Sequence, residues 1–169
     1  GFIRIHEFNT NALDEFKSAL ENLLKSGVKG FIFDVRNNPG GELNTVVNML
    51  NLLVPKDELV IIQEKNNEEI YKSTGARLTD LPMCVLINGS SASASELFSS
   101  ALRDLNGSLL IGEQSFGKGV GQTTYSLYDN SAVKLTTFNY VTKSRLNYNG
   151  IGLAPDIKVV MSEEDNRAF

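Results

Sequence analysis

A serine-rich segment at residues 90–96 has the composition of a site for nucleophilic catalysis. It reads S-S-A-S-A-S-E and follows the apolar run Met83–Ile87 after Asn88 and Gly89. We therefore expect it where a strand turns into a helix. Backbone amides at a helix N-terminus stabilise developing negative charge, and small residues let another chain approach closely. Such a turn suits a nucleophilic serine, but serines are also favoured as ordinary helix N-caps, so this segment alone leaves both interpretations open.

A second segment, residues 112–122, places a lysine among glycines. It reads G-E-Q-S-F-G-K-G-V-G-Q, with Lys118 between two glycines and Phe116 close enough to exclude water. Burial lowers the pKa of a lysine, so a neutral amine here could accept a proton from a serine near neutral pH. Gln122, four residues on, could orient this amine through its amide oxygen. The alternative is a flexible surface loop with an ordinary lysine.

The same segment has the spacing of a phosphate-binding loop, G-x-x-x-x-G-K. Gly119 stands where that loop needs a Ser or Thr to bind magnesium. A phosphate-binding loop must also open a helix, whereas residues 120–125 are rich in β-branched and aromatic side chains. The pattern therefore disfavours nucleotide binding.

A third segment, residues 36–41, reads R-N-N-P-G-G and joins the apolar run Phe31–Val35 to a helical pattern. Glycines in such a turn can aim backbone N–H groups into a shared cleft, which is what an oxyanion hole requires. Taken alone, it is an ordinary turn.

The elements that must position these segments alternate between strand and helix. The runs Phe31–Val35 and Met83–Ile87 are short and almost continuously apolar, as expected of strands buried on both faces of a parallel sheet. Three such alternations predict an α/β domain with right-handed crossovers. From the sequence we expect helices at 13–24, 43–53 and 93–104, a polar hairpin at 59–72, strands at 109–111 and 157–160, and a long hairpin at 122–141 broken at Asp129-Asn130.

Composition limits the classes of function. The chain has 169 residues, 41% of them apolar and 21% charged, which suits a single globular domain. The net charge of −4 comes from interspersed acids and bases, which argues against nucleic-acid binding. No run is long enough to span a bilayer, and Cys84, the one cysteine, is expected to pack as a small hydrophobe. Because the chain opens directly on the strand-like run Gly1–Ile5, we expect a domain excised from a longer chain.

Four motifs together resemble those of the carboxyl-terminal processing, or tail-specific, peptidases. They are D-V-R-N-N-P-G-G at 34–41, S-A-S-A-S-E at 91–96, F-G-K-G at 116–119 and P-D at 155–156, in the order of the family. The resemblance implies a ClpP/crotonase-like β-α spiral with a β-rich C-terminal part, and a serine endopeptidase without cofactor or metal. It also implies polypeptide substrates, especially flexible C-terminal tails, an exported or cell-envelope location, and a PDZ domain just before the start of this chain.

The resemblance also assigns roles to residues. It makes Ser93 the nucleophile, Lys118 the general base and Gln122 the support of the lysine. The oxyanion donors would be the amide of Ala94 and that of Gly40 or Gly41, between which the sequence does not decide.

Two positions need separate comment. Gly121 stands where the family usually has a β-branched residue, in the pattern K-G-x-V-Q, so the lysine loses a rigid neighbour. Asp104 matches an acidic residue implicated in the family, but in a regular helix it would lie about 16 Å along the axis from Ser93. We therefore expect Asp104 to be a structural partner and leave it out of the catalytic set.

Two competing interpretations remain. His6, the one histidine, could form a triad with Asp34 and Ser93, since His6 and Asp34 lie at the ends of predicted strands. Alternatively, the chain could be a catalytically silent scaffold or peptide-binding relative that keeps the fold.

Overall fold

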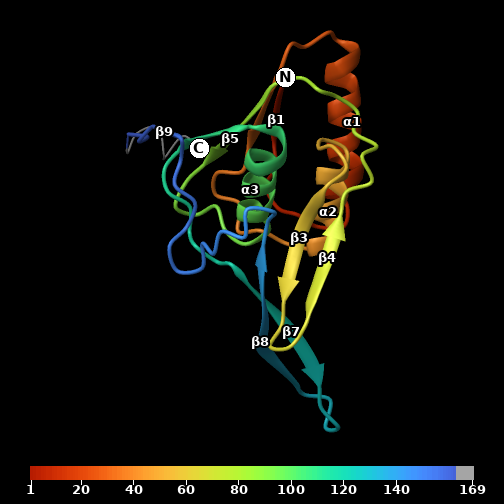
Figure 1. Cartoon of the computed structure of the whole chain (residues 1–169), viewed down its shortest axis with the longest axis vertical. Coiled ribbons are helices and arrows are strands. Elements are labelled where there is room, and N and C mark those ends of the chain that lie inside the picture. The colour runs from red at the N-terminus through yellow and green to blue at the C-terminus, as the bar shows by residue number, and fades with distance from the viewer. Residues whose placement is uncertain (163–169) are drawn as a thin grey trace.

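The computed structural model describes residues 1–162, which form two β-sheets with helices between and beside them (Figure 1). The helices are α1 (Ala12–Lys25), α2 (Leu43–Asn51) and α3 (Ala94–Asn106). The strands are β1 (Phe2–Arg4), β2 (Phe31–Asp34), β3 (Glu58–Gln63), β4 (Glu68–Lys72), β5 (Met83–Ile87), β6 (Leu109–Gly112), β7 (Val120–Ser126), β8 (Ala132–Val141) and β9 (Ile157–Lys158). No helix in this range is both long and apolar enough to cross a membrane.

The first sheet is parallel and confirms the α/β alternation. Its strand order is β1-β2-β5-β6-β9, and every neighbouring pair runs in the same direction. The last strand is shorter than predicted, because it ends at Lys158 and not at Val160. The serine-rich segment, residues 90–96, begins three residues after the end of β5, at the carboxyl end of a central strand.

The expectation that these strands are buried on both faces is wrong. Phe33, Val85 and Leu110 are fully buried, but Phe2, Ile32 and Leu109, which lie on the other face, are 40–54% exposed. Within residues 1–162 the helices cover only one face of the parallel sheet. The continuous apolar runs in these strands therefore did not indicate burial on both faces.

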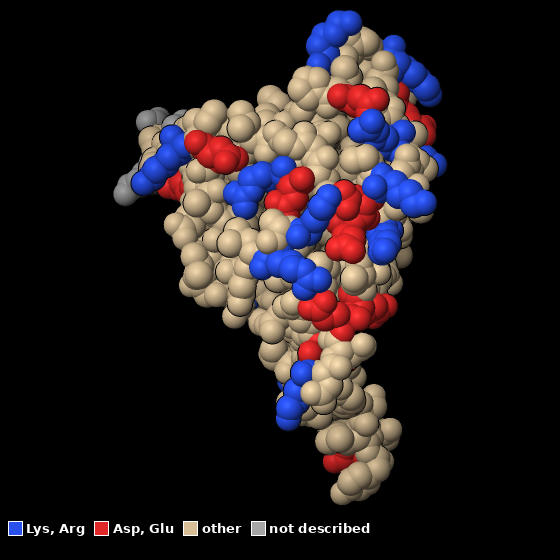
Figure 2. Space-filling model, in the orientation of Figure 1, with Lys and Arg blue, Asp and Glu red and all other residues tan. Residues whose placement is uncertain are grey.

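The second sheet is antiparallel, with the order β4-β3-β8-β7. It confirms both predicted hairpins and joins them, because Ile61 of β3 pairs with Val141 of β8. The β7–β8 hairpin projects from the body of the molecule (Figure 1). Acids and bases are interspersed over the face in Figure 2, whereas the projecting hairpin carries few of them.

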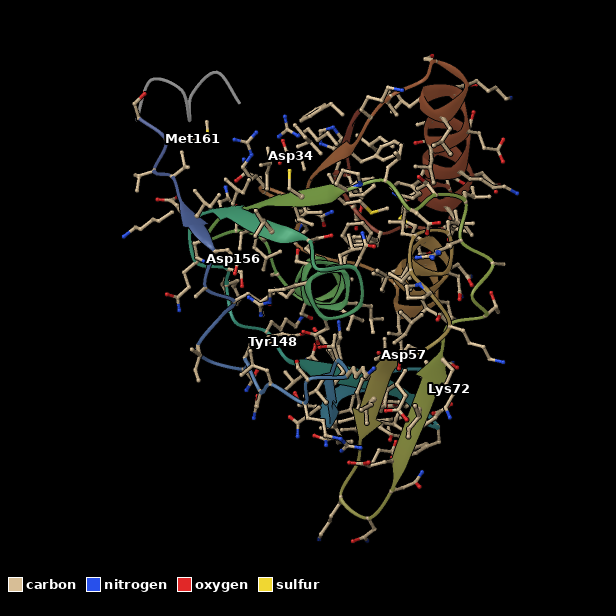
Figure 3. The ribbon with its side chains drawn as sticks, turned by 45° about the horizontal axis from the view of Figure 1, so that its top comes forward. Asp34, Asp57, Lys72, Tyr148, Asp156 and Met161 are labelled. Atoms are coloured by element: carbon tan, nitrogen blue, oxygen red, sulfur yellow. The ribbon has the colours of Figure 1, made fainter. Side chains whose placement is uncertain are left out.

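Helix α3 lies between the two sheets and is seen almost end-on in Figure 3. Its first nine residues, Ala94–Leu102, are all buried. Phe98 on this helix packs edge-on to Phe33 of β2, with ring centroids 5.6 Å apart and planes at 87°. Such packing fixes the helix between the sheets, so its N-terminus lies at a defined place between them.

Candidate active site

Ser93 is the N-cap of α3 and has a strained backbone. Its φ is 57° and its ψ is −118°, a conformation that non-glycine residues seldom adopt. The Ser93 N–H donates to Glu96 Oε2 at 2.9 Å, which is the reciprocal half of an S-x-x-E capping box. The turn from β5 into α3 thereby displays the Ser93 side chain in a cavity.

The two neighbouring serines have structural roles. The Ser91 hydroxyl donates to the Val35 carbonyl at 2.8 Å, and the Ser95 hydroxyl donates to the Asn38 carbonyl at 2.9 Å. Both side chains are buried. They bind the turn that carries Ser93 to the end of β2 and to the N-P-G-G turn.

Asn38 organises the N-P-G-G turn from inside the protein. Its buried side-chain amide donates to the Ile5 carbonyl at 2.8 Å and accepts the Gly40 N–H at 2.8 Å. Gly40 has a φ of 108°, and a Cβ there would lie 2.7 Å from Ser93 Cβ. Gly40 therefore lets the turn pack directly against Ser93, but its own amide is already bonded.

Gly41 differs from Gly40 in this respect. It lines the cavity beside Ser93 and Ala94. In the part of the chain that the structure describes, the amides of Gly41 and Ala94 donate no hydrogen bond. These two amides are therefore available to a ligand in the cavity.

The cavity has a volume of about 240 Å³ and lies between the start of α3 and the β7–β8 pair. It is lined by Gly41, Leu43, Ser93, Ala94, Leu97, Lys118, Val120, Gly121, Gln122, Lys134, Phe138 and Tyr140. It thus brings together five of the six residues predicted for the site, with Gly40 adjoining Ser93.

Lys118 lies on the loop between β6 and β7 and is half-buried. Phe116 does not shield it as expected, because that ring is 64% exposed. Instead, the apolar side chains of Leu97, Val120 and Phe138 line the cavity with it. Among residues 1–162 the Lys118 side-chain nitrogen makes no hydrogen bond to Ser93 Oγ or to Gln122, so the predicted residues share a cavity without a direct bond between them.

Glu96 is a residue of the site that was not predicted from the sequence. Its side chain is 1% exposed and accepts four hydrogen bonds. The donors are Ser93 N–H at 2.9 Å, Ser115 Oγ at 2.5 Å, Gly117 N–H at 2.6 Å and Lys118 N–H at 2.7 Å. One carboxylate therefore connects the serine turn to the lysine loop. The S-x-x-E spacing was the signal that could have found its first contact.

Tyr140 was also missed. Its hydroxyl lies 3.1 Å from Ser93 Oγ and 2.5 Å from the Lys118 carbonyl oxygen. Burial raises the pKa of Tyr140 well above the ordinary value of tyrosine, and the Glu96 charge adds to this rise. No sequence signal marked this residue, which is 47 positions from Ser93.

The structure accounts for the departure at Gly121. Gly121 of β7 pairs with Phe138 of β8. A Cβ at Gly121 would lie 2.0 Å from two ring carbons of Phe138. The aromatic ring therefore occupies the space that a side chain at this position would take.

Asp104 lies outside the cavity, in agreement with the helix argument. Its carboxylate accepts hydrogen bonds from the Thr142 hydroxyl and, at 3.1 Å, from the Ser144 N–H. It therefore attaches the end of α3 to the segment that follows β8.

The His6 triad is not assembled, and that interpretation is wrong. Both carboxylate oxygens of the buried Asp34 accept from the Arg36 guanidinium, at 2.9 and 2.8 Å. His6 is exposed and lines a different cavity, between β1 and α1.

Comparisons with known proteins agree on one family. A family model described as peptidase family S41 matches residues 1–159. A carboxyl-terminal-processing protease of Synechocystis sp. is 36% identical over 157 residues, which are 92% of this chain and 37% of that protein. A chloroplastic C-terminal processing peptidase of Tetradesmus obliquus is 37% identical over 161 residues, which are 94% of this chain and 35% of that protein.

Among solved structures, a photosystem II D1 C-terminal processing protease superposes with a TM-score of 0.90 at 37% identity. The match covers 95% of this chain and 42% of that one. The chain therefore matches 35–42% of the length of these relatives.

Proposed function

The chain belongs to peptidase family S41, and from that premise we propose that it is the catalytic unit of a serine endopeptidase in which Ser93 and Lys118 act as a pair. The observation that carries the proposal is the shared cavity. It joins the Ser93 hydroxyl, the Lys118 amine and the two unbonded amides of Gly41 and Ala94. A nucleophile, a base and two anion-stabilising donors are the parts that acyl transfer needs.

The reaction follows from these positions. The neutral Lys118 amine takes the proton of Ser93 Oγ while that oxygen bonds to the carbonyl carbon of a peptide. The amides of Gly41 and Ala94 stabilise the negative charge on the carbonyl oxygen. The C–N bond then breaks, and the leaving amine takes the proton from the Lys118 ammonium. Water hydrolyses the acyl ester by the same route, with Lys118 again accepting and returning a proton.

Lys118 must turn toward Ser93 for the first step. Catalytic hydrogen bonds are commonly long in unliganded enzymes and shorten when substrate is bound. Lys118, Val120 and Gln122 line the same cavity, so an amine that turns toward Ser93 stays within that enclosure. In this proposal Gln122 supports the reoriented amine.

Substrate class and location follow from the relatives. Two of them are named for carboxyl-terminal processing, which supports flexible C-terminal segments as substrates of this chain. β7 is an edge strand that begins at the cavity, so an extended peptide could pair with its backbone. We also propose an exported or envelope location, as the family resemblance implies, and the S41 neighbours support a ClpP/crotonase-like spiral.

Three alanine variants test the pair. We expect Ser93→Ala and Lys118→Ala to abolish cleavage of an unstructured peptide and labelling by a fluorophosphonate. His6→Ala is the control and should retain both, because His6 lies at another cavity. Loss of activity in His6→Ala with retention in Lys118→Ala would refute the Ser/Lys mechanism. A folded wild type that neither labels nor cleaves would support the silent scaffold or peptide-binding relative.

A further inference from the structure

Tyr140 reaches the candidate nucleophile from the opposite sheet. It comes from β8, its side chain is 6% exposed, and its ring packs edge-on to Tyr148 at 6.3 Å and 67°. The Tyr140 N–H donates to the Gly119 carbonyl at 3.1 Å, which fixes the backbone beside the lysine loop. Figure 3 shows Tyr148 between α3 and the antiparallel sheet, so this aromatic pair fills the space behind the site. The position of the phenol is therefore set by packing.

The Tyr140 hydroxyl has two oxygen neighbours and one proton. The Lys118 carbonyl, at 2.5 Å, can only accept, whereas Ser93 Oγ, at 3.1 Å, can accept or donate. With the phenol proton toward the carbonyl, Tyr140 accepts from the Ser93 hydroxyl. With the proton toward the serine, Tyr140 donates to Ser93 Oγ. Ser93 Oγ therefore keeps the Tyr140 hydroxyl as its hydrogen-bond partner both before and after the serine loses its proton.

The phenol does not compete with Lys118 for the role of base. Burial raises the pKa of Tyr140, so the hydroxyl stays protonated through the neutral range. A protonated phenol can orient the serine oxygen and can donate a hydrogen bond to it when that oxygen becomes negative, but it cannot remove the serine proton. A serine without this partner would be free to occupy other staggered rotamers of its side chain.

We propose that Tyr140 is a positioning residue for Ser93: its hydroxyl holds the serine oxygen in the rotamer that faces the cavity and holds the Lys118 backbone at a fixed distance from it. The inference rests on the proposed function, since it assumes that Ser93 reacts. A hydrogen bond of ordinary strength changes the population of a rotamer by up to about tenfold. This sets the size of the expected effect.

Tyr140→Phe tests the inference, because it keeps the ring packed on Tyr148 and removes only the hydroxyl. In the complete protein we expect kcat for an unstructured peptide, and the rate of fluorophosphonate labelling, to fall about tenfold. KM should stay at the wild-type value, and Tm should fall by no more than the few degrees that the loss of one hydrogen bond to the Lys118 carbonyl would cause. The fall should be by the same factor at every pH in the neutral range, since the phenol does not titrate there.

Tyr148→Phe is the matched control. It removes a buried hydroxyl from the neighbouring ring, and among residues 1–162 this hydroxyl forms no hydrogen bond with Ser93. Tyr148→Phe should therefore label at the wild-type rate. Equal rates in Tyr140→Phe and wild type would overturn the inference and leave the Ser/Lys pair intact. A loss of Tm well beyond that of one hydrogen bond, together with the fall in kcat in Tyr140→Phe, would also overturn it, because that would mark a structural role. A wild type that does not label would refute the proposed function itself.

Discussion

Glu96 is the residue on which the two halves of the site depend. A buried carboxylate that accepts four hydrogen bonds holds its donors strongly, because charge-assisted bonds are stronger than neutral ones. The serine turn and the lysine loop share this one acceptor. A change at Glu96 should therefore affect Ser93 and Lys118 together, although Glu96 does not line the cavity.

Glu96→Gln tests this coupling. Glutamine keeps one acceptor oxygen but turns an NH2 group toward donors, which leaves buried N–H groups unpaired at a cost of about 1–3 kcal/mol each. We expect a lower midpoint of urea unfolding and strongly reduced fluorophosphonate labelling. Glu64→Gln, an exposed carboxylate on the β3–β4 turn, is the control and should change neither. A stable, fully reactive Glu96→Gln would show that the two segments do not need a common acceptor.

Single residues were predictable where a local pattern marked them. The local segments and the family resemblance predicted that Ser93, Lys118 and Gln122 act together, and the structure places all three at one cavity, while their catalytic roles stay a proposal. The choice of Gly41 over Gly40 as the unbonded amide required the Asn38 contact. The role of Tyr140 could not be predicted from the sequence. Its contact with Ser93 depends on how the β7–β8 hairpin of the antiparallel sheet meets α3, which packs against the parallel sheet. The predicted role of Phe116 was wrong, because a position two residues from Lys118 in the sequence did not place its ring over the lysine.

At the scale of elements, the β7–β8 pair determines the shape of the cavity wall. Gly121, Gln122 and Phe138 all line the cavity, and the register shifts between Gly121 and Gln122. The extra residue lies on β8, because Gly121 pairs with Phe138 and Gln122 pairs with Thr136, which leaves Thr137 without a register partner on β7. Such a bulge bends the strand that contains it and increases the local twist. The Phe138 ring then lies where a side chain at Gly121 would have been.

Gly121→Val should force this ring to move. Overpacking of this kind costs about 1–3 kcal/mol, and the displaced ring should narrow the cavity. The double variant Gly121→Val/Phe138→Ala should lose less stability than the two single variants added together, because the new side chain fills the space left by the ring. Urea unfolding of the four proteins measures this coupling. Additive losses would mean that Phe138 does not replace the missing side chain.

The elements themselves were largely predictable. Each predicted helix and strand is present, with ends that differ by a few residues, because hydrophobic periodicity and turn residues mark them locally. The pairing of β3 with β8 was not predictable, since it joins segments about 80 residues apart and no local pattern records it. The exposed face of the parallel sheet was missed for the same reason, because which face of a sheet the helices pack against depends on the arrangement of the whole chain.

At the scale of the whole molecule, the site lies where two structural layers meet. Ser93 lies in the turn between β5 of the parallel sheet and α3. Lys118 lies on the loop that leads into β7, and Tyr140 lies on β8 of the antiparallel sheet. The outer part of the β7–β8 hairpin is mostly exposed, whereas β2 and β5 contain fully buried residues. Segments with few buried contacts open at lower free energy than the core.

We therefore expect the hairpin to open before the molecule unfolds. Amides of β7 and of the outer part of β8 should exchange with deuterium faster than those of β2 and β5. Labelling of Ser93 should be lost at a lower urea concentration than the circular dichroism signal. Labelling requires the cavity, which both sheets form, whereas most of the circular dichroism signal comes from the body of the molecule without the hairpin. Hydrogen exchange and a urea series measured by labelling and by circular dichroism would show this. Loss of both signals at the same urea concentration would indicate a single cooperative unit.

The four bonds of Glu96 also bear on how the protein is made. During synthesis α3 leaves the ribosome before Ser115, Gly117 and Lys118 do, so the carboxylate first lacks three of its four donors. A carboxylate in that state must remain hydrated, and the turn that carries Ser93 cannot yet be buried around it. Ser115 in turn accepts the Leu153 N–H at 2.7 Å, which arrives later still. In the proposed mechanism, Ser93 should therefore stay unreactive in a nascent chain until most of the domain has emerged from the ribosome.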